Sequence, residues 1–346
     1  MDYPKFTPQH RSLLAKYLTK DIFNQLKDKK TSNGFTLEDL IISGVKNPDS
    51  SIGTYAGDHE SYKLFAPLLD KIIEDYHHYD VRNIAKRDLD ISKLDITNNN
   101  SFDQYILSTR IRVARNLKDI PLGAAISKDK RKFVEHSVSE CLLDLKGDLK
   151  GIYYPLDNLT TKNQQQLIKD HFLFKQGDRF LDAAGLNRDW PHNRGIFHNL
   201  NKTFLVWINE EDQLRIISME KGGDIKSVFQ RLVDAIVKLE QKIDFSYDKH
   251  LGYITSCPTN LGTALRASVH IKLPNLEKNI DLFDQICSNF HLQIRGVDGE
   301  HSKSKGSVYD ISNKRRLGVS EIECIKDLYD GVTKLIQTEQ SLEVLG

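Results

Sequence analysis

The chain has 346 residues, 39% hydrophobic and 9% aromatic, which is enough to build one large domain or two modest ones around substantial cores. Lys and Arg number 49 against 48 Asp and Glu, and this net charge of +1 argues against a protein that binds nucleic acid through a basic surface. No apolar run reaches the roughly 18 residues of a membrane helix, and the first residues lack the apolar core of a signal peptide. We therefore expect a cytoplasmic protein with no membrane partner.

Residues 1–80 have the pattern of a small all-α domain. Thr7-Pro8 is a typical cap and first-turn pair, and apolar residues recur at helical spacing from Leu13 to Leu26. Thr36 gives a second helix start, and a third apolar stripe covers residues 64–76. Residues 81–100 are charged and polar, so they are predicted to be a linker.

Residues 101–346 alternate strand patterns with amphipathic helices, of which residues 226–243 form the clearest apolar stripe. Short turns join several of the strands, and this favours an antiparallel sheet over a doubly wound parallel one. The predicted fold class is therefore α+β, with a small helical domain before a larger domain built on an antiparallel sheet.

The first segment with a chemical signal is residues 108–115. If the segment is extended, Arg110 and Arg112 lie on one face, with Ile111 and Val113 on the other. Two permanent charges that close together call for an anion between them.

The second segment is residues 203–219, which has the pattern of two apolar strands joined by a turn. Glu210, Glu211 and Asp212 lie at the tip, and Arg215 lies where the chain returns. Taken alone, an acidic tip of this kind is usually a solvated turn.

The third segment is residues 255–271, where a thiol and an arginine flank one turn. Cys257 is followed by Pro258, which fixes the backbone beside the sulfur, and the strand pattern from residue 265 puts Arg266, Ser268 and His270 on one face. The plain alternative is a core cysteine beside a surface arginine. The other three cysteines, Cys141, Cys287 and Cys324, are widely scattered, which indicates neither a disulfide framework nor a zinc site.

The fourth segment is residues 293–306, a strand that ends in Arg295 and leads into a polar loop with three glycines around Glu300. Loops of this composition often serve as lids. Together the four segments place five arginines at strand ends, an arrangement suited to bidentate recognition of phosphate and hence of a nucleotide triphosphate: Arg110, Arg112, Arg215, Arg266 and Arg295.

With these motifs the chain resembles the phosphagen (ATP:guanidino) kinases, and within them the arginine kinases. The resemblance covers nearly all of the chain, and its specific motifs lie at residues 108–115, 177–181, 194–198, 202–223, 257–273 and 295–316. It implies a helical specificity domain over residues 1–80, a linker over 81–100 and a catalytic, ATP-binding domain over 101–346. It also favours a monomer over a homodimer.

The activity that the resemblance implies is reversible transfer of a phosphoryl group from MgATP to the guanidino group of L-arginine. No Asp, Glu or His constellation suggests a direct metal cage, so Mg²⁺ is expected on the nucleotide phosphates and water. Glu211 and Glu300 would grip and deprotonate the guanidinium, with Cys257 as its electrostatic partner. The implied nucleotide contacts are Ser108, Arg110, Arg112, His171, Arg215, Arg266, Ser268, His270, Arg295 and Glu300.

The resemblance assigns the amino-acid end of the substrate to the short loop at residues 47–55. Amides of Ser50, Ser51 and Ile52 would receive the α-carboxylate, and Tyr55 would offer a hydroxyl. The chain departs from common arginine-kinase sequences at Ser51, where glycine is usual, and at residues 297–298, where threonine and arginine are frequent.

Three alternative functions compete with this interpretation. The first is a kinase for another guanidino compound such as taurocyamine or lombricine. A protein-arginine kinase ranks lower, because that family begins its catalytic domain close to the N-terminus. A polyanion-binding module ranks lowest, because it explains neither Glu211 nor Glu300.

Overall fold

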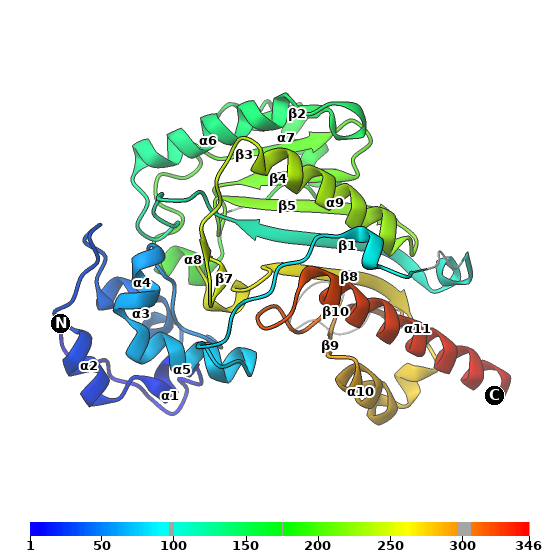
Figure 1. Ribbon diagram of the computed structural model, residues 1–346, viewed down its shortest axis with the longest axis horizontal. Coiled ribbons are helices and arrows are strands. Elements are labelled where there is room, and N and C mark those ends of the chain that lie inside the picture. The colour runs from blue at the N-terminus through cyan, green and yellow to red at the C-terminus, as the bar shows by residue number, and fades with distance from the viewer. Residues whose placement is uncertain (97–99, 175, 297–305, 346) are drawn as a thin grey trace.

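The structure is a computed structural model that describes residues 1–96, 100–174, 176–296 and 306–345. It confirms the predicted α+β class, with a helical layer formed by the N-terminal residues and a large antiparallel sheet flanked by helices (Figure 1). None of the helices in the described ranges is long and apolar enough to cross a membrane.

The N-terminal layer consists of five short helices. Their bounds are α1 Leu13–Tyr17, α2 Lys20–Leu26, α3 Leu37–Lys46, α4 His59–Leu64 and α5 Ala66–His77. The Thr7-Pro8 start is wrong, because the helix begins after Ser12, whose hydroxyl accepts from the Ala15 amide. The stripe from Leu13 to Leu26 is also split into two helices, since Thr19 caps α2. The predicted start at Thr36 is confirmed, where a capping box with Asp39 begins α3.

Eight strands form one sheet in the order β2-β3-β4-β5-β1-β8-β10-β9, and every pairing between these neighbours is antiparallel. The strands are β1 Ile106–Arg115, β2 Gly151–Pro155, β3 Gly195–Asn199, β4 Phe204–Ile208, β5 Leu214–Lys221, β8 Leu265–Lys272, β9 Leu292–Gly296 and β10 Val308–Asn313. A separate hairpin pairs β6 Tyr247–Asp248 with β7 Gly252–Tyr253.

Two long helices, α9 Ile225–Glu240 and α11 Glu321–Leu345, pack on the central strands (Figure 1). The predicted stripe over 226–243 becomes α9, and its apolar residues share a core with Ile111 and Val113 of β1. Burial of that face is what fixes the strand orientation. Because alternate residues of a strand face opposite ways, Arg110 and Arg112 must lie on the other face of the sheet.

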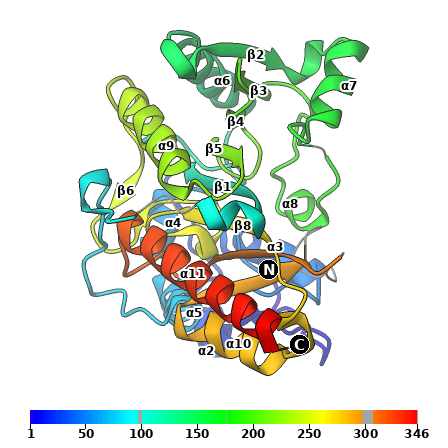
Figure 2. The same cartoon turned by 90° about the vertical axis from the view of Figure 1, so that its right-hand side faces the viewer.

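The remaining helices lie around the sheet. They are α6 Lys128–Leu143, α7 Thr161–Lys169, α8 Arg179–Ala183 and α10 Ile280–Asn289, with 3-10 turns at Ile91–Lys93, Asn100–Gln104, Gly147–Leu149, Leu156–Asn158, Pro258–Asn260 and Leu276–Lys278. Figure 2 shows α6 and β2 at one end of the molecule and α10 with α11 at the other, as the strand order requires.

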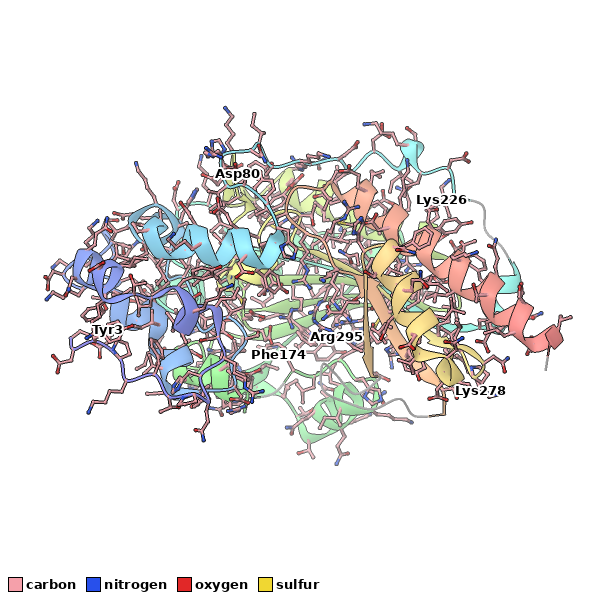
Figure 3. All side chains as sticks on the ribbon, turned by 90° about the horizontal axis from the view of Figure 1, so that it is seen from below. Tyr3, Asp80, Phe174, Lys226, Lys278 and Arg295 are labelled. Carbon is pink, nitrogen blue, oxygen red and sulfur yellow. The ribbon has the colours of Figure 1, made fainter. Side chains whose placement is uncertain are left out.

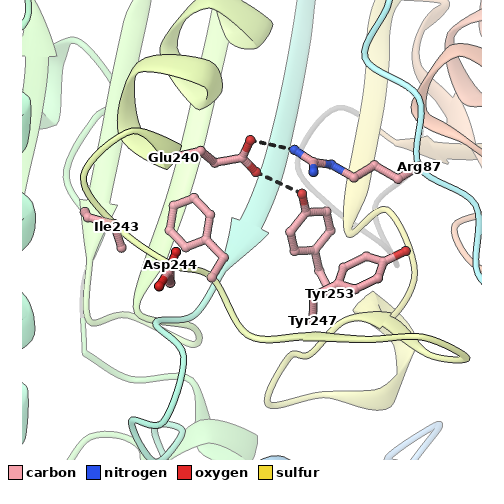
Figure 4. A pocket seen from close by; sticks show the side chains of 7 residues that line it. Arg87, Glu240, Ile243, Asp244, Tyr247 and Tyr253 are labelled. Carbon is pink, nitrogen blue, oxygen red and sulfur yellow. Dashed lines mark hydrogen bonds and ion pairs between the residues drawn. The ribbon is translucent and has the colours of Figure 1, made fainter.

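The described part of the 81–100 segment runs as a strap across the molecule and is anchored to other elements. Arg87 donates to Glu240 of α9 at 2.5 Å and lies over the ring of Tyr253, beside a cavity of about 370 Å³ (Figure 4). The Asp88 amide donates to Glu321 of α11 at 2.9 Å. The strap is therefore fastened to the helices that cover the sheet.

Candidate active site

The strand register brings the sequence-predicted arginines of β1 and β8 together on the open face of the sheet. Arg112 lies directly opposite Arg266, and Arg110 lies opposite Ser268. Opposed residues of an antiparallel pair point to the same side, so these groups are neighbours. On the other flank of β1, Ala114 is opposite Arg215 of β5, which adds a third strand to the cluster.

This concentration of positive charge is only partly compensated by the chain. Burial and the neighbouring cations Arg215 and Arg266 lower the pKa of Arg110 to about 10, and the same causes hold the pKa of Arg112 well below its ordinary value. Arg266 does have a partner, since its Nη2 lies 2.9 Å from Asp310 of β10. The guanidinium groups of Arg110 and Arg112 donate no hydrogen bond to any of the described residues, which leaves both available to an anion.

The outer strands continue the same polar face. His270 is opposite Ser108 on one side and Asp310 on the other. Arg295 of β9, labelled in Figure 3, is also opposite Asp310, and its Nη2 donates to Gln293 at 3.1 Å. The β3 to β5 side of this face is apolar, and Phe172 and Phe174 pack there with Trp207. The sheet therefore offers a row of cations bordered by an apolar wall.

The β4–β5 hairpin brings a carboxylate to the arginine row. Arg215 Nη2 lies 2.9 Å from Glu211 Oε2 and 3.0 Å from Glu210 Oε2. Burial raises the pKa of Glu211 to about 7, Arg215 opposes that rise, and the nearby Asp212 and Glu210 charges add to it. A carboxylate with a pKa near neutrality is suited to general base catalysis.

Asp212, expected to be a solvated neighbour, is instead buried with 3% of its surface exposed. Its Oδ1 accepts from Asn116 Nδ2 at 2.8 Å and from the Ser256 amide at 2.7 Å. The Ser256 hydroxyl in turn donates to the Glu211 carbonyl at 3.0 Å. These bonds fasten the hairpin that carries Glu211 to the segment that carries Cys257.

Cys257 is buried near the Glu211 carboxylate. Its Sγ lies 3.1 Å from Thr259 Oγ1. Burial and the Glu211 charge raise the pKa of the thiol to about 12, although hydrogen bonds from Thr259 pull it down. With the groups of the chain alone, the sulfur is a thiol at neutral pH, and a bound cation would favour the thiolate.

The loop at residues 47–55 reaches the same place from the helical layer. Burial, followed by the charges of Cys257 and Glu211, raises the pKa of Tyr55 well above its ordinary value, so its hydroxyl lies near both groups. The carbonyls of Ser51 and Ile52 accept from the amides of Leu13 and Leu14. The amides of Ser51 and Ile52 themselves donate to no acceptor in the described ranges, whereas the Ser50 amide is bonded to Asn47.

One described site residue, His171, is not brought into this cluster. His171 is exposed at the end of α7, next to the buried Phe172 of the apolar wall. Glu300 lies outside the described residues, as do Val297 and Asp298.

The sequence analysis also missed Arg316, which is buried and lies near Arg266 and Cys257. It lies three residues after β10, whereas the five predicted arginines lie within strands and not only at their ends, and its place in the motif at residues 295–316 was the available signal.

Among the described residues, no group of three or more His, Cys, Asp or Glu side chains could hold a metal ion. Cations in a row, a nearby carboxylate of raised pKa and a buried thiol on an antiparallel sheet define a phosphotransferase class of site, in which charge stabilisation and positioning carry the reaction.

Family models place the chain within that class. The C-terminal catalytic domain of the ATP:guanido phosphotransferases matches residues 133–342, and their N-terminal domain matches residues 8–74. The chain belongs to the ATP:guanido phosphotransferase family, as the motifs predicted, and the family's description makes ATP its nucleotide substrate.

Similar proteins include an arginine kinase of Anthopleura japonica, 54% identical over 96% of this chain and 47% of its own length, so the chain spans about half of that relative. An arginine kinase of Artemia franciscana is 51% identical over 96% of this chain and 93% of its own length. A solved lombricine kinase has a TM-score of 0.93 at 40% identity and covers 99% of this chain and 95% of its own. The duplicated taurocyamine kinase of Schistosoma mansoni has a TM-score of 0.91 at 40% identity, with 96% and 48% covered.

Proposed function

We propose that the protein is an arginine kinase, which transfers the γ-phosphoryl group of MgATP reversibly to the guanidino group of L-arginine. The observation that carries the proposal is the juxtaposition of Arg112, Arg215 and Arg266 with Glu211 and Cys257 on one sheet face. Arginine as the substrate is supported by relatives of that name at 50–54% identity.

The arginine row binds the nucleotide phosphates in this proposal. Guanidinium forks suit phosphate oxygens, and fixed cations stabilise charge that spreads over the phosphoryl oxygens during transfer. Mg²⁺ would arrive on the phosphates and keep several waters. The proposed nucleotide contacts are Ser108, Arg110, Arg112, His171, Arg215, Arg266, Ser268, His270 and Arg295.

Glu211 orients the substrate guanidinium and accepts its proton. A free guanidinium has a pKa of roughly 12.5–13.8 and no available lone pair, so a proton must leave as the nitrogen attacks the γ-phosphorus. The new N–P bond forms while the P–O bond to ADP breaks, and the proton passes to the Glu211 carboxylate. Cys257 supports the cation electrostatically and forms no covalent intermediate. Glu300 stays a prediction from the sequence motif as a second carboxylate.

The amino-acid end of the substrate lies at the loop of residues 47–55. The free amides of Ser51 and Ile52 would meet the α-carboxylate, and the Tyr55 hydroxyl lies near Glu211. The Ser50 amide was also predicted to bind the α-carboxylate. Because that amide is bonded to Asn47, only the Ser50 hydroxyl could take this role. Residues 1–80 would thus select the substrate, residues 101–346 would bind ATP, and 81–100 would link them. A cytoplasmic monomer remains our expectation.

A coupled ADP-release assay tests the proposal, with L-arginine, taurocyamine, lombricine, creatine and a denatured protein as acceptors. We expect turnover with L-arginine to exceed that with every other acceptor. Preferential turnover of taurocyamine or lombricine would reassign the substrate while keeping the reaction. Phosphorylation of the denatured protein alone would reject the proposal in favour of a protein-arginine kinase.

A further inference from the structure

The short turn Pro258–Asn260, directly after Cys257, is held from two sides. His77, the last residue of α5, lies with Nε2 2.9 Å from the Pro258 carbonyl oxygen. From the other side, Arg316 Nη1 donates to the Thr259 carbonyl at 2.9 Å and to Asn260 Oδ1 at 2.5 Å. One guanidinium nitrogen therefore bonds two successive residues of the turn.

The turn matters because its middle residue contacts the thiol. Thr259 Oγ1 lies 3.1 Å from Cys257 Sγ, so the place of that hydroxyl depends on where the Thr259 backbone is held. A group that fixes the Thr259 carbonyl also fixes the hydrogen bond that stabilises a thiolate.

The backbone of Arg316 is itself fixed against the same loop. Its carbonyl accepts from the Thr263 amide at 2.9 Å. A Cβ atom on Gly262 would stand 2.2 Å from that carbonyl oxygen, so the close approach requires glycine there, where φ is +90°. The side chain thus starts from a rigid base.

Arg316 also differs in charge from the other groups around the sulfur. The titratable groups that face Cys257 are Glu211 and Asp212 from the hairpin, Tyr55 and Tyr62 from the helical layer, and Arg316. Glu211 and Asp212 disfavour a thiolate and the two tyrosines are uncharged at neutral pH, whereas Arg316 is the cation of the set. Only 8% of its surface is exposed, so its charge is weakly screened by solvent.

We propose that Arg316 is a positioning residue for Cys257: it holds Thr259 against the sulfur and supplies a buried positive charge that stabilises the thiolate relative to the thiol. The role of the thiol in the reaction rests on the proposed function, but its ionisation does not.

The test is the pH dependence of Cys257 alkylation by iodoacetamide, followed by mass spectrometry of the peptide that contains it. In Arg316→Met we expect the profile to move to higher pH by about one unit or more, with about tenfold slower alkylation at a fixed pH below the midpoint. Arg316→Lys should recover part of the shift, because it keeps the charge but not the fork. An unchanged profile in Arg316→Met overturns the proposal.

Arg315→Met is the matched control, because Arg315 pairs with Asp327 of α11 at 2.7 Å. It removes a guanidinium and its ion pair one residue away from Arg316, and we expect no shift in the alkylation profile. An equal shift in this control would show a general structural effect and would also overturn the proposal.

A double-mutant cycle with Thr259→Val separates charge from positioning and serves if Arg316→Met folds poorly. If Arg316 acts partly through Thr259, the shift in the double variant with Arg316→Lys should be smaller than the sum of the single shifts. Strict additivity would contradict the positioning role. No nucleotide or arginine is needed for these measurements, so they can succeed even if the substrate proposal fails.

Discussion

Glu211 is held in a balance of opposing charges that sets its proton affinity. Burial and the charges of Glu210 and Asp212 raise its pKa, and the ion pair with Arg215 restrains the rise to about 7. A stronger cation nearby would lower the pKa of Glu211 further and make the carboxylate too weak a base. Without Arg215 the pKa would be higher, and Glu211 would be protonated at neutral pH. The residue can therefore both bind a cation and take up a proton near physiological pH.

Glu211→Gln should lower kcat by about 10²–10⁴ with little change in nucleotide affinity, because the amide keeps the shape but cannot accept the proton. In the native protein the base must be deprotonated, and its pKa lies near 7. Forward kcat/KM should therefore rise with pH through about 7. Steady-state kinetics from pH 6 to 9 and nucleotide titration calorimetry measure both effects. Full activity in the variant, or a profile that falls over this range, would contradict the base assignment.

Arg112→Met should separate activity from stability. The side chain has no ion pair with the described residues and is repelled by Arg110, Arg215 and Arg266. Its removal should cost about 10²–10³ in kcat through the lost transition-state contact, while the melting temperature rises by a few degrees. Activity assays and thermal unfolding measure the two quantities. A drop in both would mean that Arg112 is a structural residue.

Some of these residues could be predicted from the sequence because strand alternation has a period of two. That period puts Arg110 with Arg112, and Arg266 with Ser268 and His270, on common faces. The register that sets Arg112 against Arg266 could not be predicted, since it depends on how two distant strands align. The burial of Asp212 could not be predicted either, because its partners Asn116 and Ser256 lie far away along the chain.

At the scale of the elements, the loop over residues 47–55 is shaped by one close approach to α1. Gly53 has a φ of +87°, and a Cβ there would stand 2.8 Å from the Leu14 Cβ. The loop carbonyls are meanwhile bonded to the first amides of α1. The carbonyls of Ser51 and Ile52 are thus used by α1, while their amides donate to no acceptor among the described residues. This packing was not predictable from periodicity, which merged α1 with α2 and put their start at Thr7.

Gly53→Ala should destabilise the protein and weaken binding of arginine, because both the backbone strain and the contact with Leu14 displace the loop. We expect a loss of about 2–4 kcal/mol in the free energy of unfolding and a raised KM for arginine, with an unchanged KM for ATP. Gly34→Ala is the matched control, since Gly34 has a φ of +82° but nothing within 4 Å of an added Cβ. It should show the smaller backbone cost of about 1–2 kcal/mol and normal kinetics. Equal effects in both variants would remove the loop contact from the account.

At the scale of the molecule, the helical layer and the sheet share contacts at the substrate end of the site. The Ala56 amide donates to the Ser256 carbonyl at 2.8 Å, and the Tyr62 hydroxyl donates to the Thr255 carbonyl at 2.8 Å. One apolar cluster also joins residues of the layer to Leu186 and Leu317. The sequence analysis predicted two parts and a linker from composition, but it could not show that the parts meet at Cys257, because contacts between distant segments leave no local pattern.

The Tyr62 bond gives a means to test whether the helical layer positions the thiol segment for arginine and not for ATP. Tyr62→Phe removes one hydroxyl and leaves the Thr255 carbonyl buried without that donor, which should cost about 1–3 kcal/mol of stability. Because Thr255 leads directly to Cys257, KM for arginine should rise several-fold while the nucleotide dissociation constant stays the same. Steady-state kinetics and calorimetry with MgADP give the two values.

Tyr247→Phe is the control for this prediction. Tyr247 lies in β6 beside the cavity near Arg87, its ring packs edge-on against Tyr253, and its hydroxyl makes no hydrogen bond to residues 255–257. It should leave both constants unchanged. If Tyr62→Phe instead weakened nucleotide and arginine binding equally, the layer would be acting through general stability, and its proposed part in selecting the substrate would lose its physical basis.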